Sequence, residues 1–563
     1  MPLLAQSIIA LVARRAGRRF EQATQNPVET QRQLLRQIVA QNRDTAYGRA
    51  YNFAEIQTLD DYRRQVPFVG YEAIRPYIDR VTRGETNVLT AETPVLFAQT
   101  SGTTGDPKYI PVTPTCRKGG GMTVWMHYAR KDHPQVFAGK LITIVSPAIE
   151  GYTEGGLPFG STSGMVVKEM PRLVQKAYAV PYDAFEISDY NAKYYTIMRL
   201  GLQENISLVA TANPSSILKL AEMANHFADS LIRDVHDGTL TGEMALDPQI
   251  REAIEKRLRP DPRRARELEA ARQRRDGKLL PADYWPTVAM LGCWKGGTVG
   301  AYIERLHDWY DPEGKGMLPV RDMGYLASEA RMSIPISDHG AGGVLTVHLN
   351  LFEFVPVDQI DDDPHGEGKW DFLGVDEIEV GQEYYVFITT TGGLYRYDMN
   401  DIIEVVGSYN KTPVIEFRRK GRGMTNMTGE KLSVNQLIEA MARADAEVEA
   451  AIHHYRAEPD FTRSLYVFKV EAGQLSAEHH GDLLRAIDQA LGELNIEYQA
   501  KRSSGRLQAP ILQVMRTGWY QRKKEQLVAE GKRLFQAKTV LLDSKLGYTP
   551  EPDELVAEVH LNS

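Results

Sequence analysis

Cysteine is scarce in this sequence. Only Cys116 and Cys293 occur among 563 residues, and they lie far apart in the chain. Two distant thiols form no metal-binding pattern, and they exclude the class of small disulfide-rich secreted domains. Because so few thiols in so long a chain are typical of a reducing compartment, we expect a cytoplasmic protein.

Long hydrophobic runs are also missing. The apolar stretch near the N-terminus, residues 2–13, is too short to span a bilayer. Arg14 and Arg15 follow this stretch, whereas the basic residues of a secretory signal precede its apolar region. We therefore expect no stable membrane insertion, and we interpret the stretch as part of an amphipathic helix that packs on the body of the protein.

An excess of positive charge is absent as well. The chain has 66 Lys and Arg against 74 Asp and Glu, for a net charge of −8. This balance argues against a general nucleic-acid-binding protein, although it permits a local basic site for an anionic ligand. Hydrophobic residues make up 42% and charged residues 25%, which indicates a globular protein with a sizeable core and a length that allows more than one domain.

The hydrophobic patterns alternate between helices and strands, which predicts an α/β fold. Residues 3–24, 28–42 and 189–204 read as helices, and 139–145 and 207–211 read as buried strands. Residues 344–356 alternate as one half-buried strand, and 384–389, 394–399 and 402–406 form a predicted β-meander. The glycine-rich segment 151–164 reads as a loop that borders a substrate pocket. The arginine-rich segment 257–275 is either an anion-binding patch or, as we favour, a solvated helix with Glu267 and Glu269 as pairing partners.

A domain boundary is predicted where charges and glycines replace the strand pattern, at residues 418–423. We therefore expect a large N-terminal domain, residues 1–420, with β-sheets flanked by helices. A small α+β domain, residues 421–563, follows it, with strands over 464–470 and 510–516 and helices over 434–444, 481–494 and 520–530.

One loop carries the strongest chemical signal. Between two short apolar segments lie seven residues suited to a polyphosphate, namely Thr100, Ser101, Gly102, Thr103, Thr104, Gly105 and Lys108. The glycines allow turns that point successive N–H groups one way, and the hydroxyls and the lysine add donors and positive charge. The spacing is not that of a Walker A loop, which ends in Gly-Lys-Ser/Thr. The alternative is a solvated Ser/Thr/Gly loop without function.

Further motifs accompany this loop in a fixed order: Tyr325-Leu326-Ala327-Ser328-Glu329, Tyr395-Arg396-Tyr397-Asp398-Met399-Asn400-Asp401, Gly429-Glu430-Lys431-Leu432-Ser433 and Gln536-Ala537-Lys538. With Lys108-Tyr109-Ile110-Pro111 and Phe352-Glu353-Phe354-Val355-Pro356, they make the chain resemble the GH3 family of acyl-acid amido synthetases, in a bacterial-type form. That family belongs to the adenylate-forming, acyl-CoA synthetase-like superfamily. The resemblance runs from about residue 42 to residue 538.

The resemblance implies an adenylate-forming N-terminal domain, a mobile C-terminal lid and a ligase that forms carbon–nitrogen bonds in two steps. A small carboxylic acid attacks ATP to give an acyl-adenylate and pyrophosphate, and an amine or amino acid then displaces AMP. It implies that the loop binds the phosphates, that Tyr325 lies near the adenine and that Asp401 accepts from both ribose hydroxyls. It also implies that Ser328 belongs to the ATP-binding residues and that Glu329 holds Mg²⁺. Lys431 and Lys538 are the expected catalytic cations at the α-phosphate, with Lys538 arriving when the lid closes.

The chain departs from the family pattern in one motif. The family usually has Tyr-Arg-Tyr-Arg-Leu-Gly-Asp, whereas here Asp398 replaces the second arginine and Asn400 replaces the glycine. Asparagine tolerates a left-handed backbone, so we expect the turn to survive. Two alternatives therefore stay open beside the amido synthetase: an acyl-CoA ligase with a thiol acceptor, and a catalytically weak nucleotide- or acyl-binding regulator.

The sequence does not identify the acid or the amine, because acyl pockets are lined by scattered apolar residues that form no motif. We expect Val124, Tyr128 and Phe352 among the pocket walls. No residue is identified as the base that deprotonates the amine, since neither His127 nor His348 has a partner pattern. Beyond ATP, Mg²⁺, an acid and an amine, we expect no nucleic-acid partner, and we favour a monomer.

Overall fold

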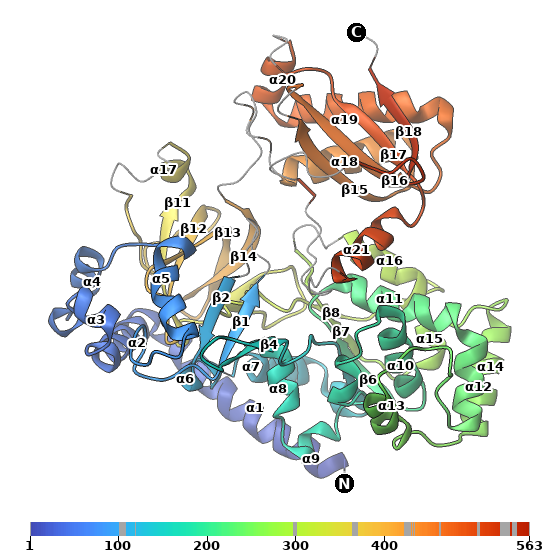
Figure 1. Cartoon of the computed structure of the whole chain (residues 1–563), viewed down its shortest axis with the longest axis horizontal. Coiled ribbons are helices and arrows are strands. Elements are labelled where there is room, and N and C mark those ends of the chain that lie inside the picture. The colour runs from blue at the N-terminus through green and yellow to red at the C-terminus, as the bar shows by residue number, and fades with distance from the viewer. Residues whose placement is uncertain are drawn as a thin grey trace. The chain divides into compact units, whose positions relative to one another are not determined.

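The computed structural model describes residues 2–100, 108–118, 120–296, 301–362, 370–421, 430, 432, 434–460, 463–503, 507–529, 541–542 and 549–561. By its internal contacts the chain divides into two units, Met1–Arg418 and Arg419–Ser563. Each unit combines β-sheets with flanking helices (Figure 1). The predicted mixture of helix and sheet is therefore confirmed.

The first unit begins with two helices, α1 (Pro2–Gln25) and α2 (Pro27–Asn42), close to the predicted ranges. Asn26 precedes α2, and a proline occupies its first turn, where the missing N–H costs nothing. The remaining helices of this unit are α3 (Ala46–Ala50), α4 (Leu59–Gln65), α5 (Tyr71–Thr82), α6 (Pro114–Arg117), α7 (Gly121–Asp132), α8 (Thr162–Lys168), α9 (Arg172–Gln175), α10 (Tyr190–Leu202), α11 (Pro214–His226), α12 (Ala228–Asp237), α13 (Pro248–Glu255), α14 (Pro262–Arg274), α15 (Pro281–Tyr284), α16 (Ala301–Tyr310) and α17 (Val357–Asp362).

A six-stranded sheet is the scaffold of this unit. Its order is β11 (Asn350–Pro356), β12 (Glu383–Thr390), β13 (Tyr397–Tyr409), β14 (Thr412–Lys420), β10 (Gly343–Leu345) and β9 (Ser333–Ile334). The prediction of one strand over 344–356 was wrong, because β10 and β11 are separate strands that three other strands separate in the sheet order. Both strands are buried on both faces. The last two strands predicted for the meander are one long strand, β13, which carries a bulge.

Two four-stranded sheets complete the unit. One is parallel, in the order β3 (Lys140–Thr143), β6 (Ile206–Ala210), β7 (Met290–Gly292) and β8 (Val320–Arg321), and it contains both predicted buried strands. The other has the order β2 (Lys108–Val112), β1 (Leu96–Thr100), β5 (Pro158–Gly160) and β4 (Gly151–Tyr152). The prediction of a loop over 151–164 was therefore wrong: its glycines allow close approach of the chain, and the segment forms a short antiparallel hairpin and the start of α8.

The arginine-rich segment forms α14, and its charges are paired at the surface. Arg263 and Arg264 both lie beside Glu267, and Arg272 pairs with Asp229. Such exposed pairs contribute little to stability, but they account for the arginines as a solvated helical face. The helix and these ion pairs are those of the interpretation that we favoured, a solvated helix in which Glu267 pairs with the arginines.

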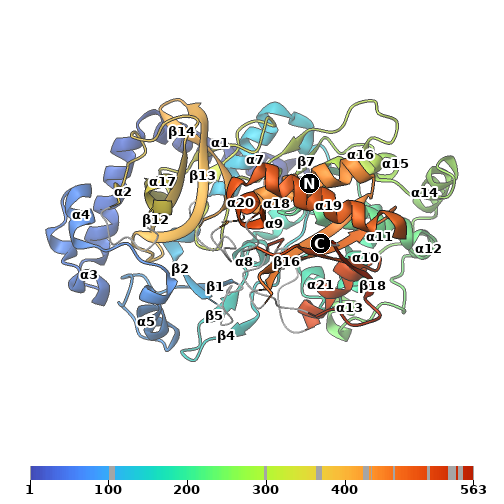
Figure 2. The same cartoon turned by 90° about the horizontal axis from the view of Figure 1, so that it is seen from above.

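The described residues of the second unit form a sheet in the order β15 (Ile452–Asp460), β16 (Leu465–Ala472), β17 (Ile511–Met515) and β18 (Leu555–His560). Its helices are α18 (Val434–Val448), α19 (His480–Leu494), α20 (Ile496–Ser503) and α21 (Trp519–Ala529). Figure 2 shows α18 and α19 side by side, and they share one hydrophobic core with the sheet. The predicted strands and helices of this unit are present, whereas β15 and β18 were not predicted.

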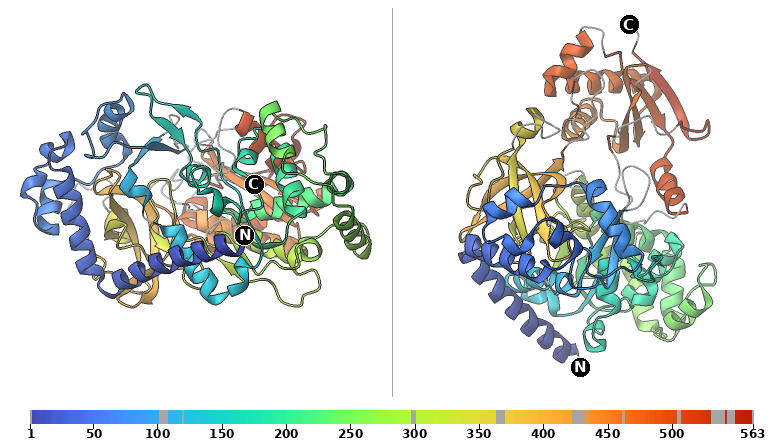
Figure 3. Two further views of the ribbon diagram at one scale, coloured as in Figure 1. Left: turned by 90° about the horizontal axis from the view of Figure 1, so that it is seen from below. Right: turned by 60° about the vertical axis from the view of Figure 1, so that its left-hand side comes forward.

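Helix α1 packs along α7, as Figure 3 shows from below. Phe20 lies edge-on to the rings of Tyr128 and His348, with centroids 6.1 and 5.7 Å away. This contact fits the expected role of α1 as an amphipathic helix on the body of the protein. Among the helices that the structure describes, none is long and apolar enough to cross a membrane.

The burial of His348 beside Phe20 predicts that the stability of the protein depends on pH. Burial lowers the pKa of His348 to about 4, and its Nδ1 makes no hydrogen bond to any described residue. The unfolded chain binds this proton with a pKa near 6.5, so the stability that neutral His348 contributes is complete above pH 6.5 and is lost as the pH falls towards 4. Between pH 7 and pH 4 the free energy of unfolding of the wild type should fall by up to about 3 kcal/mol more than that of His348→Phe, because only the wild type has this histidine to protonate. Urea titrations of both proteins measure this, with the exposed His307→Gln as the control, and parallel pH profiles for wild type and His348→Phe would contradict it.

Candidate nucleotide site

The predicted phosphate loop connects two paired strands. Strands β1 and β2 run antiparallel, and Thr100 lies opposite Lys108 in their register. The two ends of the loop are thus held together, as expected for a tight turn between short strands. The loop residues Ser101, Gly102, Thr103, Thr104 and Gly105 lie outside the described residues, as do the expected catalytic lysines Lys431 and Lys538.

Tyr325 and Asp401, which come from two different motifs, are in contact. The Tyr325 hydroxyl donates a hydrogen bond of 2.5 Å to Oδ2 of Asp401, although the residues are 76 positions apart. Both side chains are buried, with 9% and 2% of their surface exposed. Burial first, and then the negative charges of Asp401 and Glu329, raise the pKa of Tyr325 well above its usual value, so its hydroxyl stays a donor at neutral pH.

A bulge in β13 positions Asp401. Between the register pairs Tyr385–Ile402 and Phe387–Asp398, one residue of β12 faces three residues of β13, 399–401. Asn400 in this bulge has φ +48°, so the expected left-handed conformation is present. Bulges re-aim side chains and are common beside active sites. Here the bulge turns Asp401 towards Tyr325, and asparagine takes the role that glycine has in the family pattern.

The motif Tyr325-Leu326-Ala327-Ser328-Glu329 forms a tight turn. Leu326 bridges Arg331, and the N–H of Ala327 donates to the carbonyl of Ala330 at 2.9 Å. Ser328 and Glu329 therefore lie at the tip of the turn, partly exposed. Within the described residues the Glu329 carboxylate has no hydrogen bond or ion pair, so its oxygens are available to a ligand.

Two tyrosines connect these parts: Tyr397, from the same motif as Asp401, and Tyr71, which the sequence did not single out. The Lys108 ammonium lies 5.3 Å from the ring centroid of Tyr71, whose hydroxyl accepts the N–H of Tyr109 at 2.8 Å. Burial, then Glu329, Tyr71 and Asp401, raise the pKa of Tyr397, which puts all of these groups around one phenol. Tyr71 lies near Tyr397 because Val69, two residues before it, pairs with Tyr397 of β13, and α5 then begins at Tyr71. Lys108, Tyr71, Tyr397, Glu329, Asp401 and Tyr325 thus form one cluster, called the nucleotide-site cluster below.

The arginine of the same motif has a structural role. Arg396 is 4% exposed and donates to the buried carboxylate of Glu353 at 2.9 Å, while its Nη1 donates to the carbonyl of Val66. Arg63 pairs with the other oxygen of Glu353 at 3.0 Å. Asp398, the departure from the family pattern, accepts the N–H of Asn400 at 2.8 Å and so stabilises the bulge. These contacts explain how the motif, despite its two changed residues, still places the Asp401 side chain beside Tyr325.

The three residues expected in the acyl pocket lie in hydrophobic cores. Val124 and Tyr128 are on the buried side of α7, and the Tyr128 hydroxyl donates to Glu21 at 2.7 Å. Phe352 is 1% exposed in the core of the six-stranded sheet, stacked near Phe354. Their role as pocket walls stays a prediction.

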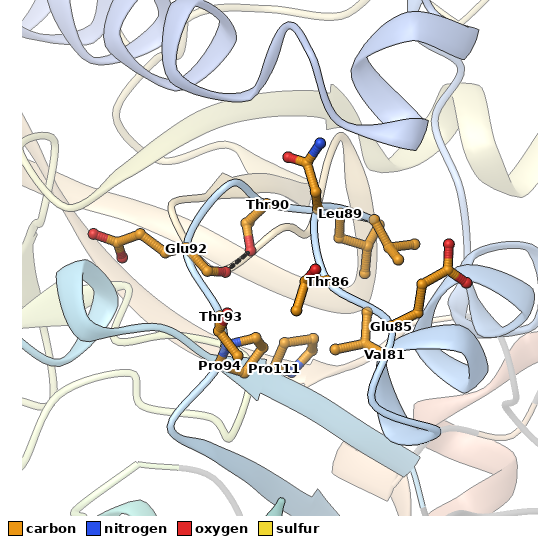
Figure 4. Close-up of a pocket in the computed structure, with 11 residues that line it drawn as sticks. Val81, Glu85, Thr86, Leu89, Thr90, Glu92, Thr93, Pro94 and Pro111 are labelled. Atoms are coloured by element: carbon orange, nitrogen blue, oxygen red, sulfur yellow. Dashed lines mark hydrogen bonds between the residues drawn. The ribbon is translucent and has the colours of Figure 1, made fainter. Parts of the chain in front are cut away.

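The described residues of this unit border a small and a large cavity. The smaller, of about 10 Å³, lies beside residues 85–94 and Pro111, where Thr90 donates to the carbonyl of Glu92 (Figure 4). It holds a single water molecule at most. The larger, of about 500 Å³, has the size of a small-molecule site and is bordered by Val344, Val406, Val414 and Glu416.

The larger cavity is separate from the nucleotide-site cluster. Along β14, Val414 packs with α7 on one face of the sheet, whereas Ile415 and Phe417 pack with Tyr325 on the other. Phe417 lies 5.5 Å from the Tyr325 ring. Because successive strand residues point to opposite faces, the cavity and Asp401 lie on opposite sides of the sheet. Neither cavity is therefore the nucleotide site.

Comparisons with known proteins cover almost the whole chain. The models of the GH3 family N-terminal, central and C-terminal domains match residues 16–313, 343–420 and 435–544, in that order. An indole-3-acetic acid-amido synthetase, GH3.2 of Arabidopsis thaliana, is 26% identical over 444 residues, which are 76% of this chain and 80% of that protein. A jasmonoyl–L-amino acid synthetase, JAR6 of Nicotiana attenuata, is 23% identical over 543 residues, 92% of each chain. The solved structure of the GH3.15 acyl acid amido synthetase shares the fold, with a TM-score of 0.82 at 20% identity over 96% of both chains.

Proposed function

The chain belongs to the GH3 family, and on that basis we propose that it is an ATP-dependent acyl-acid amido synthetase. It adenylates a small carboxylic acid and transfers the acyl group to an amine or amino acid. The observation that carries the proposal is the match of all three GH3 domain models, in order, along one chain. The contact between Tyr325 and Asp401 supports it, because residues of two family motifs meet there.

In the first step the acid's carboxylate oxygen attacks the α-phosphorus of ATP. The bond from that phosphorus to the bridging oxygen breaks, and pyrophosphate leaves. Thr100, the hydroxyls and N–H groups of residues 101–105 and Lys108 hold the phosphates, while Asp401 accepts from the ribose hydroxyls with its paired oxygens. Tyr325 fixes the Asp401 carboxylate through its hydrogen bond, and Ser328 lies on the turn beside it.

Mg²⁺ is the metal that this site suits. Hard cations of this kind take carboxylate and phosphate oxygens, and the Glu329 carboxylate has no hydrogen bond or ion pair among the described residues. Glu329 would hold the ion together with oxygens of ATP. When bound, the ion neutralises negative charge on the phosphates as pyrophosphate leaves.

In the second step the amine nitrogen attacks the acyl carbon, loses a proton and displaces AMP. Lys431 and Lys538 supply positive charge at the α-phosphate in the two steps. Lys538 lies in the second unit, so we propose that residues 421–563 act as a lid that brings it to the nucleotide. We also propose a cytoplasmic, monomeric enzyme, which the two free thiols support as far as the compartment is concerned.

A screen of aromatic, indole and fatty acids for pyrophosphate release from ATP tests the proposal. We expect release with at least one acid, followed by AMP release and amide formation only when an amine or amino acid is added. AMP release only with coenzyme A would identify an acyl-CoA ligase instead. ATP binding without exchange for any acid would identify the regulator suggested by Asp398 and Asn400.

A further inference from the structure

Arg331 lies directly beside the nucleotide-site cluster and is not used by the mechanism above. It follows Glu329 by two residues and bridges Leu326 across the turn that carries Glu329. Its own carbonyl accepts hydrogen bonds from Thr346 at 2.7 Å and Asn350 at 2.8 Å. The backbone of Arg331 is therefore fixed by the same scaffold that fixes Tyr325 and Glu329.

The side chain of Arg331 fills space that a glycine leaves open. It passes over Gly121, the first residue of α7, so closely that a Cβ on Gly121 would lie 2.2 Å from its Cδ and 2.7 Å from its Nε. Helix α7 has no side-chain cap at this end. The guanidinium nitrogen Nε thus lies near the N-terminal end of α7, where the helix dipole disfavours a cation and favours an anion.

Arg331 forms no ion pair with a carboxylate of the described residues, although the charge of Asp322 attracts it. Nη1 of Arg331 donates to the carbonyl of Met323 at 2.8 Å, and within the described residues the side chain has no other hydrogen bond and no ion pair. The nearby carboxylate of Asp322 instead accepts the N–H groups of Lys295 and Gly324, each at 2.6 Å. The side chain is only partly buried, and among the described residues its Nε and Nη2 donate to no acceptor, so these donors are available to an anionic ligand.

We propose that Arg331 is a specificity-determining residue that binds a second anionic group on the acid substrate, so that the preferred acid is a dicarboxylic acid or a similar dianion. This rests on the proposed function of the site. The reacting carboxylate is an unsuitable partner, because it loses its charge when it becomes an acyl-adenylate and would leave the guanidinium unpaired. A distal anionic group keeps its charge through both steps and keeps the pair intact.

Calorimetric binding of matched acids to the full chain tests this, with 4-carboxyphenylacetate against phenylacetate and adipate against hexanoate. For the wild type we expect the dianion of each pair to bind at least about tenfold more tightly. Arg331→Met should abolish this preference, and Arg331→Lys should keep part of it. Gly121→Ala, which retains the arginine but displaces its side chain, should weaken the preference, whereas Arg130→Met on the exposed face of α7 should not change it.

Equal binding of mono- and dicarboxylic acids by the wild type, or an unchanged preference in folded Arg331→Met, would overturn the inference. ATP–pyrophosphate exchange with the same acids separates the two proposals. Exchange without a preference for dianions leaves the amido synthetase standing and removes the role of Arg331. Tighter binding of dianions through Arg331 without any exchange leaves the anion site standing and removes the proposed activity.

Discussion

Asp401→Asn is expected to lower acid-dependent ATP–pyrophosphate exchange by about 1,000-fold, which corresponds to roughly 4 kcal/mol of transition-state stabilisation. The variant replaces one of the two carboxylate oxygens that would accept from the ribose, and it removes the charge that the Tyr325 hydroxyl contacts at 2.5 Å. The main loss should be in kcat/KM for ATP. Radiolabelled pyrophosphate exchange at several ATP concentrations measures it.

The controls for this prediction lie on the same elements. Glu404 is another acid of β13, but it pairs with Arg418, so Glu404→Gln should retain most of the exchange. Tyr325→Phe keeps the Asp401 charge and removes only its hydrogen bond, so a smaller loss of about tenfold is expected. Near-normal exchange in a folded Asp401→Asn protein would remove the ribose role of Asp401.

Glu353→Ala is expected to lower the free energy of unfolding of the first unit by about 3–5 kcal/mol, the largest stability effect that we predict. Its carboxylate is 2% exposed and pairs with both Arg396 and Arg63. Removal leaves Arg396, which is 4% exposed, as a buried cation without its carboxylate. Chemical denaturation followed by tryptophan fluorescence measures the change.

An exposed pair in the same unit provides the comparison. Glu252 on α13 and Lys256, which follows the last residue of that helix, lie one turn apart, and their side chains are 68% and 70% exposed. Glu252→Gln should leave the unfolding free energy unchanged within experimental error, because water screens such pairs. If Glu353→Ala were as mild as Glu252→Gln, the buried ion pair would not be what anchors Arg396.

The elements with regular hydrophobic periods were predictable from the sequence. Helices α1 and α2 and strands β3 and β6 occur close to their predicted ranges, because each has a local pattern that its packing does not override. The segment 344–356 misled the prediction. Its alternation looks like one half-buried strand, but it forms two strands that are buried on both faces: β11 is an edge strand, whereas β10 lies between β14 and β9. Pairing of this kind depends on distant strands and leaves no local signal.

The site was predictable where a motif carries the chemistry. Tyr325 and Asp401 were identified from separate motifs, and the structure brings them into contact. Tyr71 was missed because an aromatic residue at the start of an amphipathic helix usually indicates core packing, and only the pairing of Val69 with β13 brings it to Lys108. Arg331 was missed because the position of its side chain depends on its contact with Gly121, a residue 210 positions away in the sequence.

Transfer of isotope from the acid to AMP tests the central claim most directly. The acid that is active in the pyrophosphate screen is labelled with ¹⁸O in both carboxylate oxygens and incubated with ATP and an amine. Attack of the carboxylate on the α-phosphorus predicts one labelled oxygen in the phosphate of AMP and one in the amide. Label found in inorganic phosphate, or AMP free of label while amide forms, would contradict an acyl-adenylate intermediate.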